Sequence, residues 1–179
     1  MADSSGVELG KLIQLPTSQL VAKFAGGGHK PGSGSAAALS GVFAAALLTT
    51  VIKLTLKKAE YVEVFPEMTV LQDQVQTLRE QFVERFHEDA IQFDRVMQLR
   101  LQIRDGELDA SQKRVIRERE LEALRVATET PIQIAKLAIN LADKALYIFD
   151  YGFRGARGDS GVAIQWRWRV RRGHSSWPI

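Results

Sequence analysis

The chain contains no cysteine in its 179 residues. This absence excludes a disulfide framework, a thiolate zinc site and a cysteine nucleophile, and it suits a reducing compartment. The HExxH and GxSxG motifs are missing, and so is the GK[ST] ending of a Walker loop. The alternation of apolar and polar residues typical of β-strands is nearly absent. The sequence therefore favours a helical protein whose chemistry depends on neither a thiol nor a serine-hydrolase motif.

Excess positive charge is lacking outside the last sixteen residues. The whole chain has 24 Lys and Arg against 21 Asp and Glu, a net charge of +3, and a pI of about 9.3. Residues 164–179 hold four arginines, all three tryptophans and no acid, which leaves 20 basic and 21 acidic side chains in the rest. A near-neutral body does not favour a nucleic acid as partner. We therefore expect a single helical domain over 1–163, followed by an atypical basic, Trp-rich tail over 164–179.

The N-terminus has neither the basic region nor the apolar region of a secretory signal, so we expect a cytoplasmic protein. The longest stretch without charge is the 22 residues 31–52, which contain three glycines, several hydroxyl side chains and many alanines. They are smaller and more polar than a good membrane span. Ala37, Gly41 and Ala45 recur four residues apart, a small-residue face suited to close helix contact. A buried helix is therefore favoured, and no membrane is expected as partner.

Apolar residues recur every three or four positions along most of the chain, the spacing of a helix packed on one face. Thr17 or Ser18 caps the first expected helix, and a second runs from about Ser35 to Tyr61. From Pro66 an apolar stripe continues for about nine turns, of order 50 Å at 1.5 Å per residue. Such a length suits a bundle or a dimer.

The second half of the chain is predicted to contain a turn and two further helices. RDGELD, residues 104–109, is the turn. Pro131 is expected to break or kink the helical pattern and so to separate a fourth helix from a fifth. The predicted fold class is all-α, an up-and-down helical bundle with one very long helix, dimeric in solution.

The segment HKPGSGS, residues 29–35, is the first candidate site. Its glycines allow close approach to the backbone, and the following helix N-terminus offers unpaired N–H groups and a positive dipole end. Lys30, Ser33 and Ser35 add a cation and two hydroxyls. This set can hold an anion or the polar edge of a heterocycle. An N-cap turn with close-packing glycines is the alternative, and local chemistry alone favours it.

The second candidate is the loop GARGDSGVA, residues 155–163. Asp159 is predicted either to cap a new helix or to act as an acid or base among glycines, with Arg154 and Arg157 nearby. Metal sites have little support, because the three histidines are scattered along the chain. The run from His87 to Asp89 is more typical of a solvated helix face than of a ligand cluster, so no metal is expected.

Four blocks of the sequence resemble one family. They are LVAKFAGGGHKPGSGSAAALSGVFAAALL, HEDAIQFDRVM, ALRVATETPIQIA and GARGDSGVA. They are similar, in the same order, to segments of the formiminotransferase-cyclodeaminase C-terminal family: a P-G-G-G-S run before an Ala-rich helix, D-x-x-A-F, A-x-x-V-P-L-x-x-A and S-D-x-x-V-A. The blocks cover residues 15–163.

This resemblance implies an all-α, oligomeric enzyme that acts on tetrahydrofolate. The family reaction cyclises 5-formimidoyltetrahydrofolate to 5,10-methenyltetrahydrofolate and releases ammonia. Some relatives are methenyltetrahydrofolate cyclohydrolases. Either chemistry needs proton transfer and stabilisation of a cationic one-carbon bridge, so no cofactor is expected beyond the tetrahydrofolate substrate. A non-catalytic helical paralogue that only oligomerises is the alternative.

By position, the resemblance assigns catalytic roles to Asp89, in the D-x-x-A-F match, and to Asp159, in the S-D match. Asp94 ranks below Asp89. The residues it assigns to substrate binding are Lys30, Gly32, Ser33, Gly34, Ser35, Lys57, Lys58 and Arg157. The chain departs from the family at Ser33, which replaces a glycine, and at Gly158, which replaces the serine before the aspartate.

The tail fits the family worst, because relatives continue with a small apolar helix after the residue that matches Ala163. We offer three hypotheses for 164–179. The tail is a frameshift or truncation product, since WRWRV can be written with codons that encode Met-Ala-Val-Ala-Gly when they are read one base earlier. It is a genuine Arg/Trp segment that binds a membrane surface or nucleic acid. Or it has no function. Loss of an apolar helix predicts low stability, because each uncovered large side chain forfeits roughly 1.5–3 kcal/mol of burial.

Overall fold

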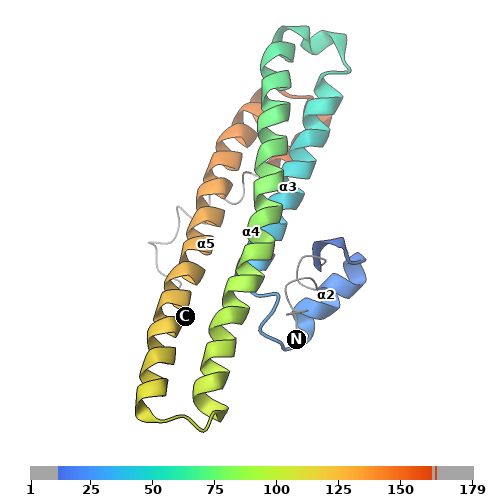
Figure 1. Cartoon of the computed structure of the whole chain (residues 1–179). Helices are drawn as coiled ribbons and strands as arrows, with labels where there is room; N and C mark the ends of the chain where they lie inside the picture. The colour runs from blue at the N-terminus through green and yellow to red at the C-terminus, as the bar shows by residue number, and fades with distance from the viewer. Residues whose placement is uncertain (1–11, 163, 165–179) are drawn as a thin grey trace, which may run out of the picture. The chain divides into compact units, whose positions relative to one another are not determined.

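The computed structural model describes residues 12–162 and residue 164, and helices are the only regular structure among them. The tail hypotheses fall almost wholly on residues outside this range. The elements in chain order (Figure 1) are η1 Leu12–Gln14, α2 Thr17–Ala25, α3 Ser33–Thr55, η2 Ala59–Val64, α4 Phe65–Asp105, α5 Ala110–Tyr151 and η3 Arg154–Ala156. Residues 157–162 form further helical turns. The predicted all-α class is confirmed.

The chain divides into two compact units. Unit 1 comprises residues 1–38 and 83–134, and unit 2 comprises residues 39–82 and 135–179. Each of the three long helices contributes a segment to both units. Two helices, rather than the single one predicted, exceed forty residues, because α4 has 41 residues and α5 has 42.

Unit 1 has a small apolar core and a well-defined turn between α4 and α5. Its buried apolar side chains include Leu20, Ala38, Phe86, Ala90, Val96, Ala123 and Ile134. The predicted turn is confirmed, since α4 ends at Asp105 and α5 begins at Ala110. Asp109 Oδ1 accepts the backbone N–H of Gln112 at 2.8 Å, and the Asp109 N–H donates to Gln112 Oε1 at 3.0 Å. This reciprocal capping pair satisfies the N–H of Gln112 in the first turn of α5 and the N–H of the cap residue itself.

Unit 2 packs the end of α3 against segments of α4 and α5. Its buried apolar side chains include Leu48, Val51, Ile52, Met68, Val75, Leu78, Phe82, Leu141, Ala145 and Ile148. A Cβ on Gly41 would lie 2.5 Å from the Phe82 ring, so only glycine admits that ring. Gly41 and Ala45 are buried, as the small-residue face predicted.

Three predicted helix boundaries are wrong. The N-cap of the first helix is Pro16 rather than Thr17 or Ser18, and no side chain caps it. The second helix ends at Thr55 rather than near Tyr61, and a short 3-10 turn, η2, follows it. The predicted separation of two helices at Pro131 is also wrong, because α5 continues through it. Thr130 and Ile134, on the two sides of this exposed proline, are both buried in unit 1. Tertiary burial on both sides therefore outweighs the loss of one backbone hydrogen bond.

By length and composition, α3 is apolar enough to cross a membrane, with a mean hydropathy of 1.9 and 44% of that stretch buried. The core helix of a soluble protein has the same properties. The side chains of Leu48, Val51, Ile52 and Thr55 are fully buried against protein, which is the environment predicted for this segment.

Candidate functional site

The candidate site in unit 1 is built where the glycine-rich loop, residues 26–32, leads into α3. Gly32 begins the helix, since its carbonyl accepts the N–H of Ala36 at 3.0 Å. The next N–H groups of the first turn have no partner within the helix. One of them, on Ser35, donates to Asp89 Oδ2 at 2.7 Å. A carboxylate from α4 thus caps the N-terminus of α3, where the helix dipole favours a negative charge.

Ser35 and Gly34 explain why the loop carries small residues. Ser35 is fully buried, and its hydroxyl donates to the same Asp89 oxygen at 2.8 Å. A Cβ on Gly34 would lie 2.0 Å from Asp89 Oδ1. The group that approaches this glycine is therefore the protein's own carboxylate. At Ser35 the N-cap alternative is favoured, because the N–H predicted to meet a ligand is already paired.

A second carboxylate, that of Asp94, joins the loop to α4 five residues further on. Asp94 is buried, with 6% exposure. Its Oδ1 lies 2.9 Å from His29 Nε2 and 3.0 Å from Lys30 Nζ. Its Oδ2 accepts the side-chain amide of Gln98 at 3.1 Å. Lys30, predicted as a substrate ligand, thus contacts an internal carboxylate.

The electrostatics of Asp94 follow from these donors. Burial alone would raise the pKa of its carboxyl group, but hydrogen bonds from His29 and Lys30, together with their positive charge, outweigh burial and hold that pKa below its ordinary value. The carboxylate is therefore ionised at neutral pH. It accepts hydrogen bonds only, so His29 Nε2 is the donor in their contact.

The structure brings six of the ten predicted site residues together in unit 1. They are Lys30, Gly32, Ser33, Gly34, Ser35 and Asp89. Ser33 is exposed in the first turn of α3, and Asp89 is partly exposed. A loop held by two carboxylates of one helix, with a cation and an imidazole at its edge, can orient a polar ligand and exchange a proton with it.

The other four predicted residues, Lys57, Lys58, Arg157 and Asp159, belong to unit 2. Lys57 is exposed. The ammonium of Lys58 lies over the Phe153 ring, 4.6 Å from its centroid, a cation–π contact.

Arg157 donates to the backbone carbonyls of Phe149, at 3.1 Å, and Asp150, at 3.3 Å. These are orphan carbonyls at the end of α5, so Arg157 caps that helix. Asp159 is partly exposed and lies within the turns 157–162 rather than at their start. The prediction that Asp159 is an N-cap is wrong, because these turns begin at Arg157 and Asp159 is already the third residue of the first turn.

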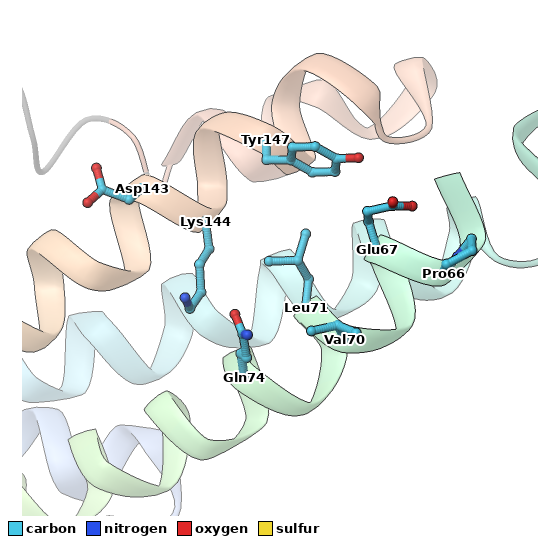
Figure 2. A pocket seen from close by; sticks show the side chains of 8 residues that line it. All are labelled: Pro66, Glu67, Val70, Leu71, Gln74, Asp143, Lys144 and Tyr147. Atoms are coloured by element: carbon cyan, nitrogen blue, oxygen red, sulfur yellow. The ribbon is translucent and has the colours of Figure 1, made fainter. Parts of the chain in front are cut away.

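Unit 2 also contains an open groove of about 500 Å³ between α4 and α5 (Figure 2). Its lining residues are Pro66, Glu67, Val70, Leu71, Gln74, Asp143, Lys144 and Tyr147. Burial, the charge of Glu67 and the neighbouring Tyr151 raise the pKa of Tyr147. None of the ten site residues predicted from the sequence lines this groove.

Within the described part of the chain, no group of three or more His, Asp or Glu side chains is placed to hold a metal ion. From the sequence alone, His29 is one of three scattered histidines and Asp94 ranks below Asp89. The five-residue spacing of the two aspartates places both within two turns of α4, but the partner of each was not visible in that spacing.

The fold and site define an all-α protein in which a glycine-rich loop before an Ala-rich helix is held by aspartates of a second helix. The sequence profile of the formiminotransferase-cyclodeaminase family matches residues 16–173. The chain belongs to this family.

Two relatives extend this result. The chain is 32% identical over 135 residues to a methenyltetrahydrofolate cyclohydrolase of Methylorubrum extorquens; the match covers 75% of this chain and 63% of the relative's length. The fold is similar to the crystal structure of a formiminotetrahydrofolate cyclodeaminase from Thermotoga maritima, with a TM-score of 0.71 and 21% identity, over 89% of this chain and 74% of the other.

Proposed function

We propose that this protein is a folate-linked one-carbon enzyme that cyclises 5-formimidoyltetrahydrofolate to 5,10-methenyltetrahydrofolate and releases ammonia. The observation that carries the proposal is the family match, which spans residues 16–173 and so includes both the glycine-rich loop and Asp159. The cyclodeaminase with the same fold supports it.

The proposed reaction starts from the protonated formimino group. N10 attacks the formimino carbon and forms the new C–N bond. The N10 proton then passes to the former imino nitrogen, the bond from carbon to that nitrogen breaks, and ammonia leaves. The methenyl bridge of the product carries the positive charge. Such chemistry needs an anionic environment and a proton carrier, and it needs no cofactor beyond the tetrahydrofolate itself.

Hydrolysis of 5,10-methenyltetrahydrofolate is the second candidate. The name of the 32% identical relative favours it. In this reaction water adds to the methenyl carbon and loses one proton. The bond from that carbon to N5 then breaks, the hydroxyl proton passes to N5, and the carbon stays on N10 as a formyl group. Both candidates share the cationic methenyl bridge, so the same binding residues serve either one.

We propose two catalytic residues, each from its own match to the family: Asp89 in unit 1 and Asp159 in unit 2. Asp89 is part of the built site in unit 1, because two hydrogen bonds from Ser35 fix one of its oxygens. Asp159 rests on its match to the S-D segment alone. Substrate contacts are proposed for the loop residues Lys30, Gly32, Ser33 and Gly34 and for the basic residues Lys57, Lys58 and Arg157, whereas the buried Ser35 holds Asp89. We also propose a homodimer in the cytoplasm.

Two assays, one for each candidate reaction, test the function. Purified full-length protein is given 5-formimidoyltetrahydrofolate while the absorbance of methenyltetrahydrofolate and the release of ammonia are followed. In a second reaction it is given methenyltetrahydrofolate, and loss of that absorbance above the spontaneous rate is measured. Ammonia release with growing absorbance identifies the cyclodeaminase, and accelerated loss identifies the cyclohydrolase.

Asp159→Asn is the matched test of the site, with Asp73→Asn, an exposed position on α4 in the same unit, as its control. We expect Asp159→Asn to lower kcat and Asp73→Asn to leave it unchanged. A folded wild-type protein with no activity in either direction would refute the enzyme and support the non-catalytic paralogue.

A further inference from the structure

The imidazole of His29 has a hydrogen-bond partner on α4 that the sequence around the loop did not predict. Its Nε2 lies 2.9 Å from Asp94 Oδ1, and the two residues are 65 positions apart. The carboxylate is nearly buried, whereas the His29 side chain is 36% exposed. A buried carboxylate that holds a partly exposed imidazole is the arrangement by which proteins orient a histidine for proton transfer.

We propose that His29, oriented by Asp94, is the residue that carries the proton in the reaction proposed above. The inference rests on that proposed function and deepens it. His29 is the catalytic group because it would contact the reacting nitrogen atoms. Asp94, with the donors that hold it, acts through His29 and is a positioning residue.

The tautomer of His29 follows from the contact. Because Asp94 only accepts hydrogen bonds when ionised, Nε2 carries the proton in the neutral ring. Nδ1 is then the free base, and it has no hydrogen-bond partner among the described residues. A partly exposed imidazole whose Nδ1 is the basic atom meets the requirement for a proton acceptor in the loop.

Three further groups hold this pair in place. Lys30 Nζ lies 3.0 Å from the same Asp94 oxygen that binds His29, and Gln98 holds the other oxygen. The Phe93 ring lies beside the imidazole, with centroids 6.2 Å apart. Among the described residues, Asp94 on α4 contacts His29, and Lys30 of the loop shares the same Asp94 oxygen.

In the cyclodeaminase step, Nδ1 takes the proton from N10 as the new C–N bond forms. The same Nδ1 then gives that proton to the departing nitrogen, which leaves as ammonia. The imidazole ends as it began, and the charge stays on the methenyl bridge. In the hydrolytic alternative, Nδ1 takes the proton of the attacking water and releases it to solvent. His29 can thus carry the proton in either of the two candidate reactions.

The test compares wild type, His29→Gln and a control, His87→Gln, which removes another histidine of unit 1 whose ring packs edge-on against Phe86. We expect His29→Gln to lower kcat by about 100-fold or more, the usual contribution of a positioned acid–base group. Its dissociation constant for 5-formyltetrahydrofolate, a stable analogue, stays within a few-fold of wild type. His87→Gln keeps the wild-type kcat.

Chemical rescue separates proton transfer from a structural role. Added imidazole is expected to restore activity to His29→Gly in proportion to its concentration. Asp94→Asn keeps the inference testable should the His29 variants fail to fold. In Asp94→Asn no negative charge stabilises the His29 imidazolium. The acid limb of this variant's kcat/KM against pH is therefore expected to move to lower pH.

Three outcomes overturn the inference. A folded His29→Gln with wild-type kcat and pH profile refutes it while the proposed function stands. Loss of activity in His29→Gly without imidazole rescue, together with an unshifted profile in Asp94→Asn, assigns the pair to structure alone. A wild-type protein inactive on both folates refutes the proposed function and this inference with it.

Discussion

Asp94 shows how much one side chain contributes to the loop. Its two oxygens accept from His29, Lys30 and Gln98, so a nearly buried charge is fully paired. Hydrogen bonds to a charged group stabilise more than neutral ones, and each is worth about 1.5–3 kcal/mol. The contact between the loop and α4 therefore depends on the ionised form of this residue.

We expect Asp94→Asn to lower the free energy of unfolding by about 1–3 kcal/mol at pH 7. The amide keeps the shape of the side chain but offers no charge to Lys30 and His29. Urea unfolding followed by circular dichroism measures the change. The control is Asp105→Asn, which removes an exposed carboxylate paired with its neighbour Arg104; an equal effect in both variants would contradict the prediction.

The same residue predicts a pH dependence of stability. The pKa of Asp94 is lowered in the folded protein from its ordinary value of 3.8. A depressed folded pKa contributes stability that is present above the unfolded value and is lost as pH falls through the folded value. The difference in unfolding free energy between wild type and Asp94→Asn should therefore narrow below about pH 4. A difference that stays constant from pH 7 to pH 3 would refute the assignment.

Gly34 is required by a close approach rather than by backbone conformation. Gly34→Ala would place a Cβ 2.0 Å from Asp89 Oδ1, so the carboxylate must move and its bonds to Ser35 weaken. We expect a loss of about 1–3 kcal/mol in unfolding free energy, as for overpacking elsewhere. Gly32→Ala is the control, because the nearest atom to its added Cβ is 3.7 Å away. Thermal unfolding of both variants decides it.

At the scale of elements, α5 contradicts the rule that proline ends a helix. The helix has 42 residues with Pro131 inside it. Thr130 and Ile134 are buried on either side, so ending the helix at the proline would expose one of these positions. The packing of this long helix therefore outweighs the cost of a proline in a helix interior, which is about 3 kcal/mol relative to alanine.

Pro131→Ala is accordingly expected to stabilise the protein, by up to about 3 kcal/mol. The substitution restores an N–H donor to the backbone of α5. The midpoint of thermal unfolding measures it. Thr128→Ala, an exposed position one turn earlier, should change stability by less than about 0.5 kcal/mol. A Pro131→Ala protein that unfolds at a lower temperature would mean that the proline is needed where it stands.

At the scale of the whole molecule, large apolar side chains remain uncovered along α5. Val115 is 47% exposed, Leu121 67%, Ile132 49% and Ile139 50%. Single exposed apolar residues are ordinary, but these four, together with Val126 and Tyr151 on the same helix, favour a second protein surface. We predict a homodimer. Light scattering after size exclusion should give twice the chain mass of 19.9 kDa, and Leu121→Glu should shift the mass toward the monomer more than Glu122→Gln, its exposed neighbour.

Local patterns in the sequence were sufficient for the fold class and for most element boundaries. The apolar spacing from Met68 onward is helical whatever it packs against, and the turn at Gly106 follows from local chemistry alone. The end of α3 and the continuity of α5 were predicted wrongly, because both depend on residues distant in the chain. Thr55, for example, ends α3 while its hydroxyl accepts the N–H of Phe153 at 2.9 Å, 98 positions away.

The sequence by itself determined that this protein is helical, and the order of its motifs indicated the family to which it belongs. Helical periodicity and motif order are properties of neighbouring residues, so they can be read along the chain. Only the tertiary structure decided that Asp89 caps α3 and that Asp94 holds His29 and Lys30. Hydrogen bonds between residues 54 and 65 positions apart depend on how the loop lies against α4, and the order of residues along the chain does not contain that information.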